Sequence, residues 1–468
     1  MSRAEIWYRM SEKTRIERER LGVRTGRKPA AERDLLEPLG GGLRDTSARR
    51  AASRAPGAFE LFPKAPGKPR FFFDHTAAGR RRISALVDEC FPVWKARALH
   101  EAEKICRHRL TLLGYGDFDL GASIDWNRDP LTGRSWGSRF WADYAPVADP
   151  FAGDPKLILE LGRHQHLPKL GKAYFLTGEE GFAGEAIRQM QGWIDQNPPW
   201  IGIHWHSSLD IGLRAVNWIW TLFFLSGSQS LDPSAARRIL ESLHAQLDHV
   251  HRHPSIYSSP NTHLIGEAVS LFIAGLLLRG WKNAALWRRF GSSFLLREIE
   301  RQVSSEGIHT ELSSYYHCYA LDMFMQALVL ARNNGFKVPR YAWCRLSDML
   351  DFLLHVTRPD GSLPSLGDDD GGRALALVRA DYYSFLDAFS TGAVLFRRED
   401  LKHQARSYHE ETLWLLGPES WEVYRQLEAR PPSATRAAYP EAGYFIQRSG
   451  WSQQDSHWIL DCGKFGVQ

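Results

Sequence analysis

The chain of 468 residues is 43% hydrophobic and 24% charged, a composition typical of globular proteins, which excludes disordered, collagen-like and coiled-coil chains. Its net charge of +5 is uneven, because residues 1–100 carry 22 Lys and Arg against 12 Asp and Glu. The rest of the chain shows neither a basic stripe nor a known binding module, so nucleic-acid binding is not expected. Aromatic residues make up 12% of the chain, including 17 Trp, and indicate either a large core or platforms for sugar stacking.

The sequence predicts no metal site, cofactor or membrane helix. The five cysteines are scattered and include no CxxC pair, which argues against a disulfide framework and a zinc site. The first twenty residues lack the apolar stretch of a secretory signal, and no segment has the roughly 18 apolar residues of a membrane span. The most apolar segment, residues 264–278, contains Glu267 and is better explained by a buried helix.

The first quarter of the chain changes character several times. Residues 1–82 begin with a charged helical pattern and continue through a triple glycine and a stretch rich in Ala, Arg and Pro. This order predicts a short basic helix followed by a poorly ordered linker. The apolar spacing over residues 83–113 predicts helix, and the Gly-, Asp- and Trp-rich segment 114–136 predicts a structured loop.

Residues 154–416 repeat a helical pattern, with apolar residues three and four apart and Gly, Pro or Asn between the segments. The predicted helices span residues 156–176, 181–196, 208–225, 233–251, 261–279, 284–302, 318–334, 341–356 and 374–389. Because little strand signal interrupts them, the expected fold is a toroid or solenoid of paired helices rather than a βαβ fold.

The pattern changes near the C-terminal end. Residues 443–448 and 457–462 are short runs of aromatic and β-branched residues on either side of a turn-like segment, which predicts a β-hairpin. An isolated hairpin is marginally stable in water. We therefore expect it either to pack on the helical body or to begin a larger β-domain that is cut off.

Polar residues interrupt the helical pattern at residues 258–263. Asn261 directly precedes an apolar helix, where Asn is a common N-cap, and capping alone would explain it. His263 would lie in the first turn, where the helix dipole favours a neutral imidazole, and this placement suits a proton acceptor.

A second polar segment, residues 306–319, holds two histidines, two carboxylates and three tyrosines. A Tyr hydroxyl transfers a proton when neighbouring donors or cations activate it, although the same tyrosines could instead pack with their hydroxyls bonded to the backbone. A third segment, residues 358–373, carries an acidic run without the spacing of a calcium loop. Its acids are expected to cap a helix and to pair with Arg373.

Six segments together resemble the N-terminal part of the heparinase II/III family of polysaccharide lyases, which includes alginate lyase-like members. They are IDW at 124–126, KLILELGRHQH at 156–166, LDIGLRAVNW at 209–218, NTHLIGE at 261–267, GIHTELSSYYH at 307–317 and LPSLGD at 363–368. The resemblance covers residues 100–468 and follows the order expected for the family.

The resemblance implies a mainly α fold, an (α/α) toroid of paired helices followed by an antiparallel β-sandwich, with the substrate cleft between the two. Residues 1–82 would then be a basic N-terminal helix and linker, residues 83–420 an incomplete toroid, and residues 438–468 the first strands of a truncated β-domain. A further active-site histidine and any metal site would belong to the β-domain, so no cofactor is expected in this chain. The family is largely periplasmic, although no signal peptide is visible.

The reaction implied by the resemblance is β-elimination on an acidic, uronate-containing polysaccharide. Asn261 would bind the uronate carboxyl group, and His263 would neutralise its charge or act as the base. Tyr316 would be the proton shuttle, with Tyr315 and Tyr319 as the alternatives in neighbouring register. The expected substrate contacts are Arg163, His164, Trp205, Arg214, His309, Glu311, Tyr315, His317 and Tyr319.

Two other functions fit parts of the same pattern. Glycoside hydrolysis on a helical toroid would need two facing carboxylates, for which Glu311 and Asp368 are candidates. A non-catalytic polysaccharide-binding protein would keep the cleft and its aromatic platforms without turnover.

Overall fold

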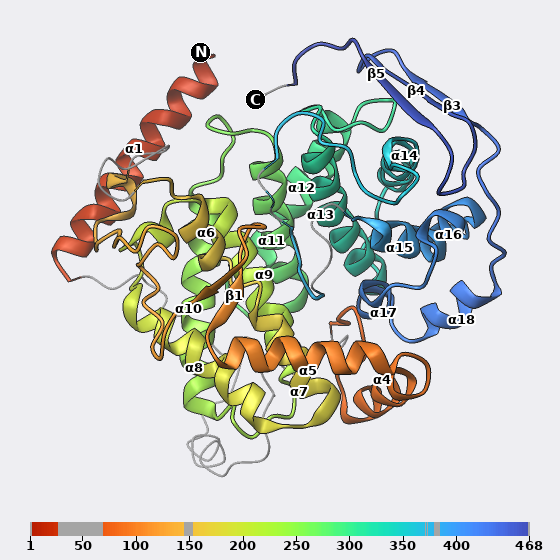
Figure 1. The fold of residues 1–468 in the computed structure, drawn as a ribbon. Helices are drawn as coiled ribbons and strands as arrows, with labels where there is room; N and C mark the ends of the chain where they lie inside the picture. The colour runs from red at the N-terminus through yellow and green to blue at the C-terminus, as the bar shows by residue number, and fades with distance from the viewer. Residues whose placement is uncertain are drawn as a thin grey trace.

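The computed structural model of the chain describes residues 2–26, 69–144, 153–369, 371, 373–378 and 384–466. These residues are mainly helical with short strands, which confirms the predicted fold class (Figure 1). No helix in this part of the chain is both long and apolar enough to cross a membrane. Within the same residues, no three His, Cys, Asp or Glu side chains are grouped as a metal site requires.

The helices form two layers around an incomplete ring (Figure 1). Each inner helix contacts the next inner helix along the chain, and the outer helices pack behind them. The inner helices are α5 (Pro92–Cys106), α7 (Leu167–Thr177), α9 (Ser208–Phe224), α11 (Thr262–Leu277) and α13 (Ser314–Asn333). The outer helices are α4 (Ala77–Cys90), α8 (Glu180–Gln196), α10 (Pro233–Arg252), α12 (Ala284–Gln302) and α14 (Arg340–Val356).

Sequence composition explains which helices lie inside. Every residue of α9 is buried, and α11 is almost as completely buried, as expected for helices that are apolar on all sides. The outer helix α10 is amphipathic and begins at Asp232, whose carboxylate accepts hydrogen bonds from the next backbone amides. At Gly275 of α11, a Cβ atom would lie 2.4 Å from the backbone nitrogen of Arg288 in α12, so this glycine permits the close packing of the pair.

Three predicted helices differ from the structure. The pattern over residues 83–113 is divided between α4 and α5, and its last part, Arg109–Thr111, is a strand rather than helix. The pattern over residues 156–176 is divided into α6 (Lys156–Gly162) and α7, because His164 adopts a left-handed backbone conformation with φ of 56°. The prediction of a helix at 374–389 is wrong: residues 374–378 are not helical, and the next helix is α15 (Leu386–Phe396). Three short helices follow, α16 (Glu399–Ala405), α17 (Glu410–Leu416) and α18 (Glu419–Gln426).

The N-terminal helix α1 (Arg3–Arg24) is longer than expected and lies against the side of the body (Figure 1). The middle of the predicted linker, residues 27–68, lies outside the described residues. The linker prediction is wrong for residues 71–82, because Phe71, Phe72 and Phe73 are buried and α4 begins at Ala77. Phe71 stacks on Phe223 of α9 with ring centroids 3.9 Å apart.

The predicted hairpin is confirmed and packs on the helical body. Strands β4 (Tyr444–Arg448) and β5 (His457–Asp461) pair antiparallel, and β3 (Arg436–Tyr439), which was not predicted, pairs with the other edge of β4. Alternate β4 residues face α14, where the Arg448 guanidinium donates to the carbonyl of His355 at 3.0 Å. A second hairpin, β1 (Arg109–Thr111) with β2 (Asp117–Asp119), follows α5. Two 3₁₀ turns, η1 (Trp141–Asp143) and η2 (Ile203–Trp205), complete the elements.

Candidate active site

A polar cavity of about 140 Å³ lies where the two ends of the helical ring approach each other. Residues of α5, β1, the α6–α7 connection, the first turn of α13 and segment 371–378 line it. Its charged and polar lining consists of Glu101, Arg109, Thr111, Glu160, Gln165, His166, Lys169, Tyr315 and Arg373. Three basic side chains and two carboxylates thus share this lining, with the basic ones in excess.

A buried ion cluster extends from this cavity toward α11. The Arg163 guanidinium contacts Glu160 at 2.6 Å and Asp210 at 2.5 Å. Arg163 is the C-cap of α6, and Asp210 lies in the first turn of α9. Burial raises the pKa of the Asp210 carboxyl, but Arg163 and then other neighbours, including His263, lower it below its ordinary value. His263 therefore lies within electrostatic reach of this cluster.

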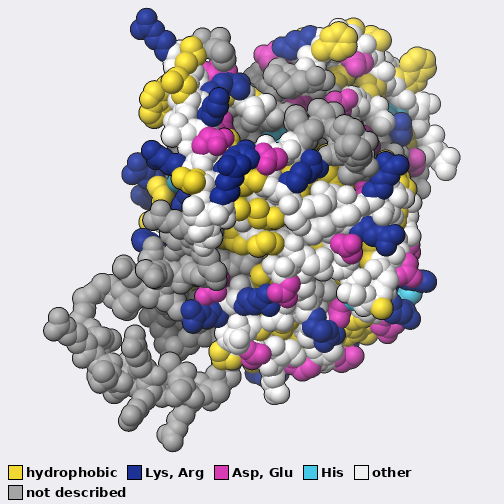
Figure 2. All heavy atoms as spheres, turned by 90° about the vertical axis from the view of Figure 1, so that its left-hand side faces the viewer, with side chains coloured by type: hydrophobic (Ala, Val, Ile, Leu, Met, Phe, Trp, Pro, Cys, Tyr) yellow, Lys and Arg dark blue, Asp and Glu magenta, His cyan; other side chains and the backbone are white. Residues whose placement is uncertain are grey.

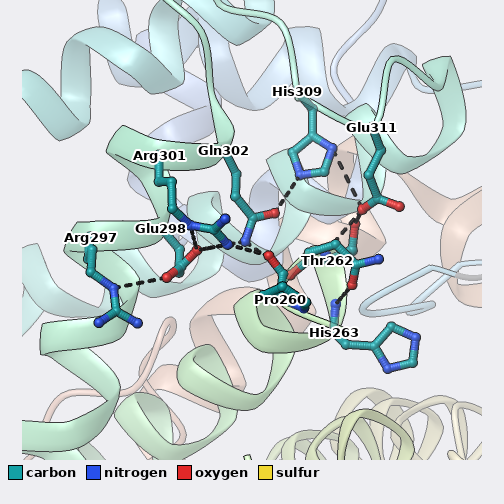
Figure 3. A network of polar contacts seen from close by, with 10 residues as sticks. Pro260, Thr262, His263, Arg297, Glu298, Arg301, Gln302, His309 and Glu311 are labelled. Carbon is teal, nitrogen blue, oxygen red and sulfur yellow. Dashed lines mark hydrogen bonds and ion pairs between the residues drawn. The ribbon is translucent and has the colours of Figure 1, made fainter. Parts of the chain in front are cut away.

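Asn261 and His263 occupy the start of α11, as predicted. Asn261 is the N-cap, and its Oδ1 accepts a hydrogen bond from the backbone N–H of His263 at 3.2 Å. Both side chains are half-buried, whereas the rest of α11 is enclosed by its neighbours. In Figure 3 the His263 ring points away from the polar network on the other side of the helix start.

This polar network stabilises the N-terminal turn of α11 on the side opposite the His263 ring (Figure 3). Glu311 accepts hydrogen bonds from the backbone N–H of Thr262, at 3.0 Å, and from its hydroxyl. Gln302 donates to the carbonyl of Asn261 at 3.1 Å, and Glu298 accepts from the same amide group at 2.9 Å. The N-terminal turn of α11 thus has partners from α12 and from the loop before α13.

The three tyrosines of the first turns of α13 face different surroundings. Tyr315 lines the cavity and packs edge-on against Phe385, with ring centroids 5.4 Å apart. The Arg373 guanidinium lies 4.4 Å from the centre of the same Phe385 ring. Tyr319 is buried one turn further along α13. Tyr316 is half-buried and is not part of the cavity lining.

The electrostatics connect these phenols to the two buried arginines. Burial lowers the pKa of Arg163, but Asp210, then Tyr319 and Glu160, raise it, and the net pKa lies well above its ordinary value. Burial likewise lowers the pKa of Arg373, and neighbouring acids together with Tyr315 raise it. Each of the two phenols therefore has a fixed cation in its neighbourhood.

Three predicted substrate contacts are fully buried, and this corrects their assignment. Arg214 has no exposed surface, and its guanidinium donates to the carbonyls of Gly162 and His204 at 3.1 and 3.0 Å. Burial lowers the pKa of Arg214 to about 9. His164 is also fully buried, and Trp205 is 1% exposed, so neither offers a surface to a sugar. These side chains support the site from within the core.

His309 and His317 are buried as well, so the prediction that they touch the substrate is corrected too. His309 Nε2 pairs with the amide oxygen of Gln302 at 3.1 Å, and His317 Nε2 pairs with the carbonyl of Met349 at 3.0 Å. Burial lowers the pKa of His309 to about 3 and that of His317 to about 4, which leaves both rings neutral. Glu311 is engaged with Thr262, as described above.

Several residues of the cavity and of the adjoining ion cluster were not predicted. Asp210 and Glu160 lie within segments that carried the resemblance, but neither was singled out, because their pairing with Arg163 is not visible along the chain. His166 lines the cavity, and burial lowers its pKa to about 4. The pairing of Arg163 with Asp210 joins two helices, so no local sequence pattern indicated it.

The fold and this site define a protein with a ring of paired helices and a cavity lined by both basic and acidic side chains. The chain belongs to the heparinase II/III family, because the family model for the heparinase II/III N-terminus matches residues 94–396.

Known relatives and solved structures agree with this membership. The chain is 28% identical over 368 residues to a heparin-sulfate lyase of Bacteroides stercoris, which covers 74% of this chain and 48% of that protein. It is 24% identical over 366 residues to a heparin-sulfate lyase of Pedobacter heparinus, covering 76% of this chain and 48% of the relative. A crystal structure of heparinase III superposes with a TM-score of 0.56 at 20% identity, over 86% of this chain and 55% of the other. The chain therefore spans about half the length of these relatives.

Proposed function

We propose that the protein cleaves an acidic, uronate-containing polysaccharide by β-elimination. The observation that carries this proposal is the placement of Asn261 and His263 at the half-buried start of α11, within electrostatic reach of the Arg163–Asp210 pair. The cation-lined cavity with Tyr315 continues from the same ion cluster through Glu160. Family membership and the heparin-sulfate lyases among the relatives support the same reaction class.

The chemistry makes three demands. The carboxylate attached at C5 must be neutralised, because only then is the C5 proton acidic enough to be removed. A base must accept this proton, and the leaving O4 must receive one. Asn261 uses Oδ1 for its cap, so its Nδ2 group is the part that would donate to the substrate carboxylate. His263, on the same turn, would complete the neutralisation or accept the C5 proton.

For the proton transfer to O4 we assign Tyr315 rather than its neighbour Tyr316. Tyr315 lies near Arg373 and lines the cavity, whereas Tyr316, like Asn261 and His263, lies outside that lining, so the neighbouring cation is what favours Tyr315. A nearby cation stabilises the negative charge that develops on a phenol during proton transfer. Tyr319 is the second alternative, since it lies near Arg163.

The assay follows the ultraviolet absorbance of the unsaturated uronate that elimination creates. Heparan sulfate, alginate and other uronate polymers serve as substrates, since the cavity cations suit any polyanion of this kind. Tyr315→Phe is expected to lower kcat at least a hundredfold, within the usual contribution of acid–base groups. Tyr316→Phe and the exposed Tyr115→Phe are the matched controls and retain most of the activity.

Other outcomes would overturn the proposal. New reducing ends without ultraviolet absorbance would indicate hydrolysis, for which the structure offers little support, because Glu311 is bonded to Thr262. Binding of the polymer without any product would indicate a polysaccharide-binding protein. Loss of activity in Tyr316→Phe but not in Tyr315→Phe would indicate that Tyr316 is the residue that transfers the proton.

A further inference from the structure

Helix α1 lies outside residues 94–396, which the family model covers, yet it contacts the segment that leads into the site. Figure 2 views the molecule from the side on which α1 lies in Figure 1, and Lys and Arg side chains there stand among exposed hydrophobic ones. On its outer face Trp7 and Met10 are 73% and 66% exposed. The inner face packs against residues 253–257, in the connection between α10 and α11.

The first half of α1 holds the backbone of this connection. The Tyr8 hydroxyl donates to the carbonyl of Pro254 at 2.7 Å, and the Arg9 guanidinium donates to the carbonyl of Tyr257 at 3.3 Å. The rings of Tyr8 and Tyr257 lie 5.1 Å apart, centroid to centroid. Asn261 follows Tyr257 by four residues, so these contacts lie just before the proposed catalytic turn.

The second half of α1 holds a side chain of the same connection. Glu19 is 4% exposed, and both of its carboxylate oxygens lie 3.0 Å from Nε2 of His253. The indole N–H of Trp141 donates to Glu19 at 3.4 Å. A buried carboxylate is stable only where such donors meet it, so this contact specifies how α1 lies on the body.

The body holds the connection from its other side. Glu267 of α11 accepts from the backbone N–H and the hydroxyl of Ser255, at 2.7 and 2.6 Å. The hydroxyl of Ser208 in α9 donates to the carbonyl of His253 at 2.7 Å. The connection is therefore clamped between α1 outside and α9 and α11 inside.

We propose that Tyr8 and Glu19 are positioning residues that hold the connection between α10 and α11, residues 253–260, and thereby orient Asn261 and His263. The contacts of α1 with this connection do not depend on the reaction, whereas their effect on catalysis rests on the proposed function. Neither residue touches the substrate; each acts through Pro254 or His253. Helix α1 is thus an accessory part of the site supplied by this chain outside its family region.

Hydrogen–deuterium exchange of the full chain tests the hold without any substrate. Tyr8→Phe removes one hydrogen bond. Glu19→Gln replaces one carboxylate oxygen with an amide N–H₂ group, which is itself a donor and cannot accept from His253 or Trp141. The loss of one hydrogen bond corresponds to about a fivefold change in the exchange rate. We therefore expect the backbone amides of residues 255–263 to exchange about fivefold faster in Tyr8→Phe, and faster still in Glu19→Gln. The control Glu17→Gln changes an exposed carboxylate of the same helix and leaves this exchange unaltered.

Unchanged exchange at residues 255–263 in both variants would overturn the proposal. In the polymer assay the two variants are expected to lower kcat about tenfold with KM within twofold of the wild type, because a displaced catalytic turn impairs turnover more than binding. A kcat equal to that of Glu17→Gln would refute the positioning role. If the wild type forms no unsaturated product, the proposed function fails, while the exchange result still decides whether α1 holds the connection.

Discussion

Replacing Arg163 with Gln removes the only cation that contacts both Glu160 and Asp210 in the described ion cluster. The two carboxylates are 8% and 5% exposed, so water does not replace the lost partner. Removing one member of a buried ion pair costs about 3–5 kcal/mol of stability. Because the Arg163 side chain itself is 14% exposed, we expect a loss near the lower end, about 3 kcal/mol.

The pH dependence of this loss has a definite sign. In the wild type the pKa of Asp210 is lowered, so the pair stabilises the fold above about pH 3.9 and this stabilisation is lost as the pH falls below that value. Without Arg163, burial alone would raise the pKa of Asp210 above its unfolded value, as it already raises that of Glu160. The variant would then lose stability as the pH rises, so its deficit grows from pH 4 to pH 8.

Urea unfolding at pH 4, 6 and 8 measures this deficit. The matched control is Arg425→Gln, which breaks an exposed contact with Glu422 and is expected to cost less than about 1 kcal/mol at every pH. A deficit for Arg163→Gln below about 1 kcal/mol, or one that shrinks as the pH rises, would refute the assignment of a buried, charge-dependent cluster.

Three further changes test other parts of the structure by urea unfolding. Arg214→Ala is expected to cost about 3 kcal/mol, since the carbonyls of Gly162 and His204 lose a buried donor; a loss under about 1 kcal/mol would contradict this. Burial raises the pKa of Glu267 to about 8, so this residue should make the wild type less stable as the pH rises from 5 to 8, and Glu267→Gln should flatten that slope; an unchanged slope would argue against it. Phe71→Ala should cost about 3–5 kcal/mol, and a neutral effect would remove this segment from the core.

The long inner helices were predictable because their apolar residues dominate every local alternative. The pattern over 208–225 ends one residue beyond α9, and the start of α11 differs by one residue. The left-handed turn at His164 and the non-helical segment 374–378 were not predictable, since tertiary contacts rather than local preference determine them. The burial of Phe71, next to Pro- and Lys-rich residues, also depends on partners distant in sequence.

The sequence predicted only those site residues whose role depends on their neighbours along the chain. Asn261 and His263 stand at a helix start, where capping preferences and the helix dipole act on adjacent residues. The link from Arg163 to Asp210 joins residues 47 positions apart, and the choice between Tyr315 and Tyr316 depends on which face of α13 borders the cavity. Such choices require the three-dimensional packing of the ring.

The most direct test of the account is the ultraviolet absorbance of unsaturated uronate product formed by the wild type, Asn261→Ala and Tyr315→Phe on the same acidic polysaccharide. The account predicts product from the wild type and at least a hundredfold lower kcat in both variants, with polymer binding retained. Product formed equally by all three proteins, or new reducing ends without ultraviolet absorbance, would contradict it.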